Sequence, residues 1–251
     1  MIKMNESRTL PIWQAMLLAY MTGVLWLRRN PMSLVFTAIS PFSLLFVLFV
    51  ISGGQYTHFA VAGSLVMALV GYGLALGQDI SFYKTEYKVQ DVFVASPVSP
   101  LTYMMGLALS ELLFGLPALT VLATLVLYLG SFLSIFLLVA TVLLIWGAMS
   151  AMGFFLSSHM LHMRNATQVI SFVNVILAVL PPVFYSINSV PEVLRPLAYA
   201  LPTTHASLML QYIMGMSTPA GWSVGFGFAI QFAYLVGFLT LAKTKAIWRE
   251  N

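Results

Sequence analysis

Two very long apolar stretches dominate the chain. Residues 30–78 contain no Asp, Glu, Lys or Arg, and residues 92–163 contain only one of them, Glu111. About 20 apolar residues in a helix are enough to cross a bilayer, so each stretch is long enough for two spans. Turn-forming residues divide the two stretches, at residues 52–55 and 130–131. The pattern therefore predicts two pairs of transmembrane helices.

The second half of the chain is predicted to add two more spans. Residues 165–191 are apolar as far as Pro181 and Pro182, which make continued helix unfavourable. A last apolar run follows near the C-terminus. The chain is thus predicted to be an all-α, polytopic membrane protein, a single transmembrane domain over residues 1–251. The six expected spans are residues 32–52, 59–79, 101–129, 132–157, 166–186 and 219–242.

The segment at residues 12–29 is also apolar, but the basic residues favour a place on the membrane surface. Lys and Arg concentrate on the cytoplasmic side of membrane proteins. With residues 12–29 on the surface, ten of the eleven Lys and Arg fall on one side and only Arg195 on the other. If the segment spans, the best split is eight against three. We therefore expect an interfacial helix there, with both termini in the cytoplasm.

Residues 187–214 are predicted to form a re-entrant or interfacial pair of short helices. Pro191, Pro196 and Pro202 interrupt this stretch. A seventh span here would move the basic C-terminal tail to the outer side. Irregular backbone at membrane depth must pack against protein or line a wet cavity, so we expect this segment to be buried in the bundle.

Composition supports the membrane interpretation and excludes several classes of protein. Hydrophobic residues make up 60% of the chain and charged residues 7%, and the mean hydropathy is +0.94. This is far less charge than a soluble domain carries. The net charge of +4 comes from residues scattered at the ends of apolar runs, which does not indicate nucleic-acid binding. With no cysteine and no P-loop motif, we expect no metal, cofactor or ATP site on this chain.

The most polar inner segment runs from Asp79 to Ser96. It carries acidic and basic residues together with several aromatic ones, among them Phe82, Tyr83 and Tyr87. Two interpretations of this amphipathic pattern stay open. It predicts either a short helix lying on the inner leaflet or a docking helix for a cytoplasmic partner.

Within this segment the sequence resembles the type-2 permeases of ABC exporters. After the second span these proteins carry an acidic residue, a Gly-Thr-Leu-Glu stretch, two aliphatic residues and a Ser-Pro-x-Ser motif. Glu86 matches the first acid, Asp91 matches the glutamate, and residues 93–94 match the apolar pair. Residues 96–99 read Ser-Pro-Val-Ser, while Lys88 and Val89 stand in place of the glycine and threonine.

A second match lies between the fifth and sixth expected spans. Residues 191–194, Pro-Glu-Val-Leu, and residues 201–204, Leu-Pro-Thr-Thr, resemble the proline-punctuated segment of the same family. With the interfacial helix and the six spans, the resemblance covers nearly the whole chain.

The resemblance implies a transport subunit, not an enzyme, in the plasma membrane of a prokaryote. Two permease subunits, as a homodimer or with a related permease, would enclose the substrate path among the membrane lipids. Separate P-loop ATPase subunits would bind ATP and dock on the inner face. The implied docking residues are Lys84, Glu86, Tyr87, Lys88 and Asp91.

Four polar residues within the spans are candidates for the path or for coupling. Glu111 lies about 15 Å into the third span, where an unpaired carboxylate is costly. We expect it to face the bundle interior, relieved by Ser110, Gln168, Asn174, water or protonation. Gln168, Ser171 and Asn174 fall within an arc of about 120° on the fifth span. They would line a polar path or bond neighbouring helices.

Two other functional classes remain as alternatives. A membrane-embedded lipid-modifying enzyme would use Glu111 and a histidine as its acid and base. No histidine is placed near Glu111 by the expected topology. A passive channel or scaffold would give no reason for a docking segment between the second and third spans.

Overall fold

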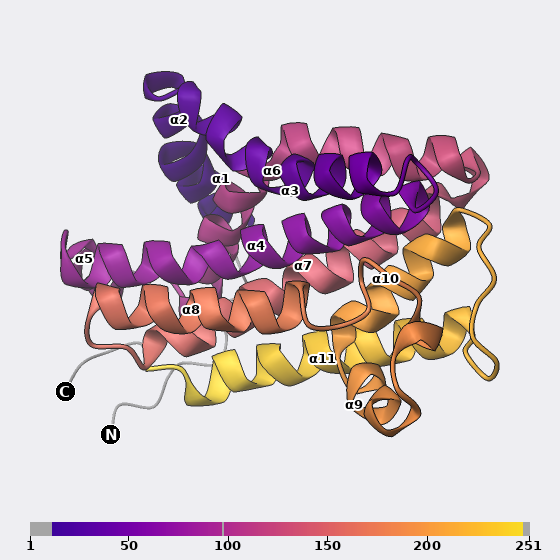
Figure 1. The fold of residues 1–251 in the computed structure, drawn as a ribbon. Helices are drawn as coiled ribbons and strands as arrows, with labels where there is room; N and C mark the ends of the chain where they lie inside the picture. Colours follow the sequence, from indigo (N-terminus) through magenta and orange to yellow (C-terminus); the bar gives the residue numbers. More distant parts are fainter. Residues whose placement is uncertain (1–11, 97, 248–251) are drawn as a thin grey trace.

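The computed structural model describes residues 12–96 and 98–247, apart from the side chains of residues 89 and 91. All regular secondary structure in these residues is helical (Figure 1). This confirms the predicted all-α class for the described part of the chain.

Five helices are long and apolar enough to cross a membrane. Their positions agree with five of the six expected spans, although α4 extends six residues beyond its predicted end at residue 79. The chain reversal at residues 52–56 lies where the turn residues predicted it: Gly53 and Gly54 have φ values of +56° and +86°, which glycine adopts without strain. The five helices are α3 (Met32–Ile51), α4 (Thr57–Thr85), α6 (Pro100–Leu129), η2 with α7 (Phe132–Ser134 and Ile135–Ser158) and α11 (Val224–Lys245).

The fifth expected span is shorter than predicted. Helix α8 (Met163–Ala178) has 16 residues, which corresponds to about 24 Å, less than the ~30 Å hydrocarbon core. It ends eight residues before the predicted limit of residue 186. Pro181 and Pro182 follow in irregular backbone, as their missing amide donors require.

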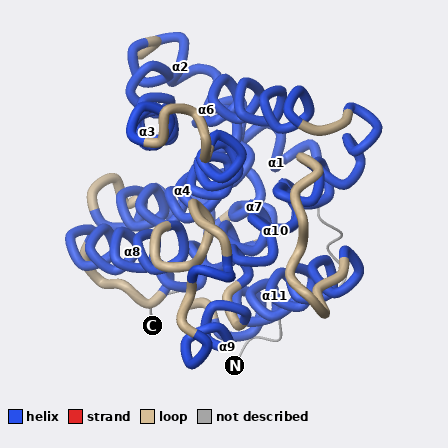
Figure 2. The backbone as a smooth tube through the Cα atoms, turned by 45° about the vertical axis from the view of Figure 1, so that its right-hand side comes forward, coloured by secondary structure: helices blue, strands red, loops and turns tan. Residues whose placement is uncertain are grey.

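Helix α4 lies at the centre of the bundle (Figure 2). It packs against α3, α6, α7 and α8, and most of its residues are buried. Its closest neighbour is α7, because glycines allow the two backbones to approach. A Cβ on Gly77 would lie 2.7 Å from the carbonyl oxygen of Gly153 in α7. The hydroxyl of Ser157 donates a hydrogen bond to the carbonyl of Gly77 across the same contact.

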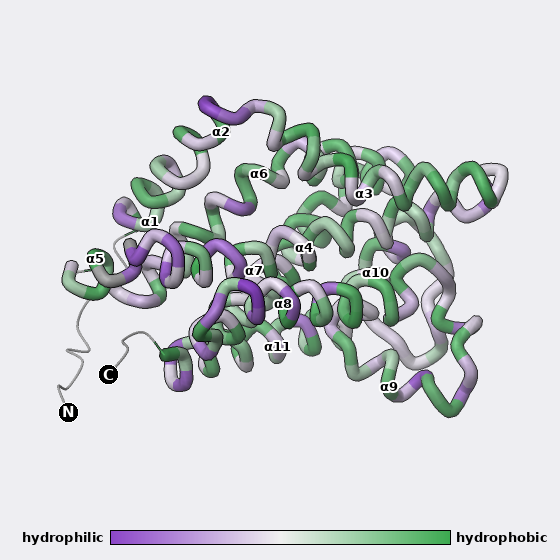
Figure 3. Tube along the Cα trace, turned by 60° about the vertical axis from the view of Figure 1, so that its left-hand side comes forward, coloured by the Kyte–Doolittle hydropathy of each residue, from purple (hydrophilic) through white to green (hydrophobic). Residues whose placement is uncertain are grey.

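The predicted interfacial segment is a helix throughout. It consists of α1 (Ile12–Ala19), a π-helical turn η1 (Tyr20–Val24) and α2 (Leu25–Arg29). Leu18 packs over Gly106 of α6, while Arg28 and Arg29 are exposed in the last turn. Figure 3 shows the hydrophilic end of α2 standing away from the green, hydrophobic bundle.

The short helices gather at opposite ends of the bundle (Figure 1). The end of α4, the helix α5 (Val89–Ala95) and the end of α11 lie at one end. The turn between α3 and α4 lies at the other end, as do η3 (Ile187–Ser189), η4 (Glu192–Leu194) and α9 (Arg195–Tyr199). Helix α10 (Pro202–Ile213) then enters the bundle, and nearly all of its residues are buried.

Candidate functional site

The segment expected to dock a partner forms an exposed corner between α4 and α6. Glu86, Tyr87 and Lys88 are exposed and link α4 to the short helix α5. Lys88 has a φ of +52°, a left-handed conformation that turns the chain sharply between the two helices. Lys84 lies in the last turn of α4, where its Nζ donates a 3.5 Å hydrogen bond to the carbonyl of Met160. Asp91 belongs to α5, but its side chain lies outside the described residues.

Aromatic contacts fix this corner to the bundle. The rings of Phe82 and Tyr87 meet edge to face, with centroids 4.7 Å apart, and Tyr83 stacks near Tyr87 at 6.3 Å. On the other side, Phe93 of α5 contacts Tyr103 of α6 at 5.1 Å. Aromatic pairs of this geometry add about 0.5–1.5 kcal/mol each beyond simple burial. The corner is therefore held from both α4 and α6.

The Ser-Pro-Val-Ser motif ends α5 and begins α6. The hydroxyl of Ser96 donates to the carbonyl of Phe93 at 2.8 Å and accepts from the amide of Val98 at 3.3 Å. Ser99 is the N-cap of α6 and accepts from the amide of Thr102 at 3.1 Å, with Pro100 at the first helical position. The motif thus gives the return from the corner a defined geometry.

Helix α8 presents the other expected polar residues to the outside of the chain. Gln168 and Ser171 are exposed, together with Arg164 at the start of the helix. Asn174 is half-buried, and its Oδ1 is buried without a hydrogen-bond partner. The opposite side of α8, which carries Ile170 and Leu177, is buried. The exposed stripe changes from polar near α5 to apolar at Phe172, Val175 and Val179.

Glu111 faces the bundle interior as expected, but its partner was not predicted. Only 7% of Glu111 is exposed, and its carboxyl is hydrogen-bonded to that of Asp79 on α4. The expectation that Ser110 offsets the cost of burying the Glu111 carboxyl is wrong, because the hydroxyl of Ser110 is buried without a hydrogen-bond partner. Gln168 is exposed on α8 and gives no relief either. The sequence signal was present in Asp79, the acidic residue that directly follows the apolar run of residues 30–78.

Buried polar contacts hold the segment of residues 187–214 in place. The ring of His205 is fully buried, and its Nε2 donates a 2.8 Å hydrogen bond to the carbonyl of Tyr199. Its Nδ1 accepts a 3.2 Å bond from the indole Nε1 of Trp222, so the neutral ring fits both partners. Burial lowers the pKa of His205 below its usual value, and the bond to Tyr199 opposes this shift. Arg195 pairs with Glu192, three residues earlier in the chain, at 3.8 Å.

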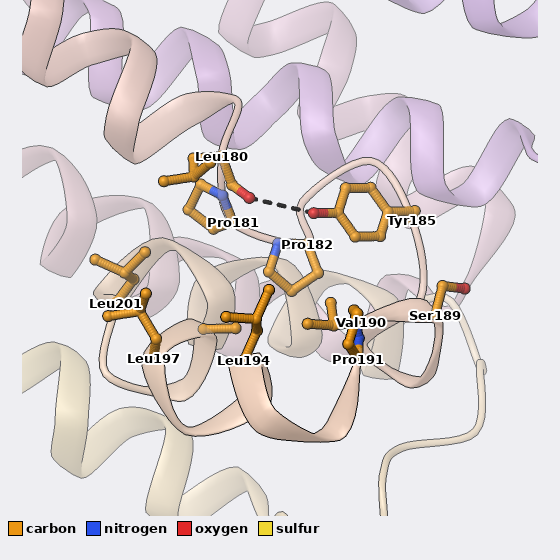
Figure 4. A pocket seen from close by; sticks show the side chains of 11 residues that line it. Leu180, Pro181, Pro182, Tyr185, Ser189, Val190, Pro191, Leu194, Leu197 and Leu201 are labelled. Carbon is orange, nitrogen blue, oxygen red and sulfur yellow. Dashed lines mark hydrogen bonds between the residues drawn. The ribbon is translucent and has the colours of Figure 1, made fainter.

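An apolar cavity of about 260 Å³ lies where the end of α8 meets the segment of residues 187–214 (Figure 4). Pro181 and Pro182 form one wall, and Leu194 and Leu197 point toward them from the short helices. The hydroxyl of Tyr185 is directed to the carbonyl of Leu180 at 3.2 Å. The exposed stripe of α8 therefore leads from polar residues near α5 to this cavity.

Comparison with known proteins identifies the architecture. Residues 14–215 match the family described as ABC-2 type transporter, and this region contains the corner, α8 and the segment of residues 187–214. A comparison with curated proteins gives no match. Because the family match covers most of the 251 residues, the chain belongs to the ABC-2 type transporter family, as a membrane permease.

Proposed function

We propose that this chain is the transmembrane subunit of an ATP-driven ABC exporter, acting as a dimer with separate ATPase subunits. The observation that carries the proposal is the corner of Lys84, Glu86, Tyr87, Lys88 and Asp91, held by ring contacts from both α4 and α6. A force applied to α5 would therefore reach two long helices at once. This is the connection that an ATPase would need to drive the membrane part.

The exposed side of α8 supports a path between two copies of the chain. Gln168 and Ser171 would face lipid if the protein acted alone, and polar groups in lipid are costly. A second copy with its own α8 opposite would surround these residues with protein and water. In this arrangement Asn174 would lie at the edge of the path, and each subunit would provide half of the lining.

The proposed topology places the corner in the cytoplasm. Helices α4 and α11 both end in basic residues at the end of the bundle where α5 lies. Basic residues are typical of the cytoplasmic side, so both termini would also face the cytoplasm of a plasma membrane, in a prokaryotic cell. Residues 163–186 would complete a sixth crossing as a short helix followed by irregular backbone. Residues 187–214 would be re-entrant from the outer side.

Co-purification with an ATPase tests the proposal. The chain is tagged and purified in mild detergent from the cells that produce it, and the P-loop ATPases that co-purify with it are identified by mass spectrometry. We expect the ATPase to be retained in stoichiometric amount. Reversing charge at Glu86 and Asp91, as Glu86→Lys with Asp91→Lys, should reduce the retained ATPase severalfold, because these residues lie at the proposed contact.

Glu192→Lys is the matched control, since it makes the same reversal on an exposed residue at the opposite end of the bundle. An exposed ion pair contributes about 0–1 kcal/mol, so all three substitutions should leave the fold intact. Equal retention of the ATPase by the double reversal and by Glu192→Lys would contradict docking at the corner.

A further inference from the structure

The contact between Asp79 and Glu111 joins the two helices that carry the docking corner. Asp79 lies about two turns before the end of α4, which leads into α5, and Glu111 lies about three turns after the start of α6, which follows α5. Their carboxyl groups are hydrogen-bonded to each other inside the bundle. The pair thus connects α4 to α6 inside the bundle, close to the corner that α5 forms between these two helices.

A hydrogen bond between two carboxyl groups requires a proton on one of them, because ionised carboxylates only accept. If both carboxyl groups were ionised while in contact, their like charges would repel each other in the poorly solvated interior of the bundle. Tyrosines are the titratable groups that act on the pair: Tyr72 and Tyr83 from α4, and Tyr103 from α6. Among the other helices packed against α4 and α6, α1, α3 and α7 contain no charged or titratable residue. Others carry Tyr20 on η1, Asp91 on α5, Arg164 on α8, His205 and Tyr212 on α10, and Tyr234, Lys243 and Lys245 on α11.

Side-chain packing connects the pair to the corner and to the rest of the bundle. Tyr103 is fully buried, lies within range of the electrostatic influence of Asp79, and its ring contacts that of Phe93 in α5. On the other side, the ring of Tyr72 lies over Gly115, one turn beyond Glu111. The hydroxyl of Tyr72 donates a 2.9 Å hydrogen bond to the carbonyl of Thr37 in α3.

We propose that Asp79 and Glu111 form a proton-dependent clamp, which holds α4 and α6 together behind α5 and releases them when its proton is lost. The clamp deepens the proposed function, because loosening it would change how firmly the docking corner is supported. The proton in the pair is a property of this chain alone, so it can be tested without an ATPase.

Infrared spectroscopy of the purified chain in lipid nanodiscs detects the proton directly. We expect a carbonyl stretching band of a protonated carboxylic acid at neutral pH, which disappears as the pH is raised. The band should be absent in Glu111→Gln and in Asp79→Asn. It should persist in Glu192→Gln, which removes an exposed carboxyl at the other end of the bundle. A wild-type spectrum without the band at neutral pH overturns the proposal, whatever the variants do.

Thermal unfolding against pH then tests the clamp itself. Deprotonation should lower the midpoint temperature of the wild type by several degrees as the pH is raised. Glu111→Gln supplies an amide donor that needs no titratable proton, so its midpoint should change less over the same range. Parallel curves for the wild type and Glu111→Gln would show that the pair does not clamp the helices. If the clamp is confirmed but no ATPase is retained, the proposed function fails and the clamp stands.

Discussion

Replacing Gly77 with alanine should force the central helices α4 and α7 apart. A Cβ at this position would lie 2.7 Å from three atoms: the carbonyl oxygen of Gly153, the hydroxyl oxygen of Ser157 and Cδ1 of Ile170. Ordinary contacts begin near 3.4 Å, so the neighbours must move by about 0.7 Å. A backbone oxygen in a packed helix cannot rotate away, as the end of a side chain can.

The cost follows from two contributions. Overpacking in a dense core costs about 1–3 kcal/mol. The same displacement would weaken the hydrogen bond from Ser157 to the carbonyl of Gly77, worth about 0.5–1.5 kcal/mol. The sum is about 1.5–4.5 kcal/mol. For a chain of this size each kcal/mol shifts the midpoint temperature by about 2–4 °C, so a fall of at least about 3 °C is expected.

Gly71→Ala is the matched control. Gly71 lies on the same helix, and a Cβ there would have no atom within 4 Å. Both substitutions gain the same helix propensity, up to about 1 kcal/mol, so their difference isolates the contact with α7. The assay is thermal unfolding of the purified proteins in one detergent. Equal midpoint temperatures for Gly77→Ala and Gly71→Ala would refute the close packing of α4 on α7.

Three further predictions test the topology, the path and the segment of residues 187–214. In intact cells, an impermeant thiol reagent should label a cysteine at Gln55 but not one at Thr85, and labelling at Thr85 would contradict the orientation. In membranes, a water-soluble thiol reagent should label Gln168→Cys faster than Phe36→Cys, a control on the exposed side of α3, because a thiolate forms only where water reaches. Equal labelling rates would argue against a wet path along α8. Since burial lowers the pKa of His205, the unfolded chain binds its proton first, so the free energy of unfolding should fall as the pH drops below about 6.5. Thermal unfolding should show a weaker fall for His205→Gln, with His58→Gln as the control, and parallel pH curves would exclude His205 as the cause.

The long helices could be predicted because the hydrocarbon core of a bilayer requires long runs of apolar residues, which are visible in the sequence. A run of apolar residues must form a helix to satisfy its backbone in lipid, and turn residues such as Gly53 and Gly130 mark where it reverses. The end of α8 could not be fixed in this way. Residues 179–186 are apolar enough for a span, but packing and the two prolines decide that the helix ends at Ala178.

The corner was predicted through its motif, whereas the carboxyl pair was not. Asp79 and Glu111 are 32 positions apart, and no spacing rule says that two acids on different helices face each other. Contact between them depends on the rotation of α4 against α6, which Tyr72 and Gly115 set by packing. The close contact of α4 with α7 had a readable signal, since Gly73 and Gly77 form a G-x-x-x-G motif.

ATP hydrolysis in reconstituted membranes tests the central claim most directly. The ATPase that co-purifies with this chain would be assayed in proteoliposomes with the wild-type chain, with the Glu86→Lys, Asp91→Lys double variant, and with lipid alone. The account predicts that the wild-type chain changes the rate of ATP hydrolysis and that the double variant does not. The same rate in all three preparations would contradict an ATP-driven permease that is coupled through the corner between α4 and α6.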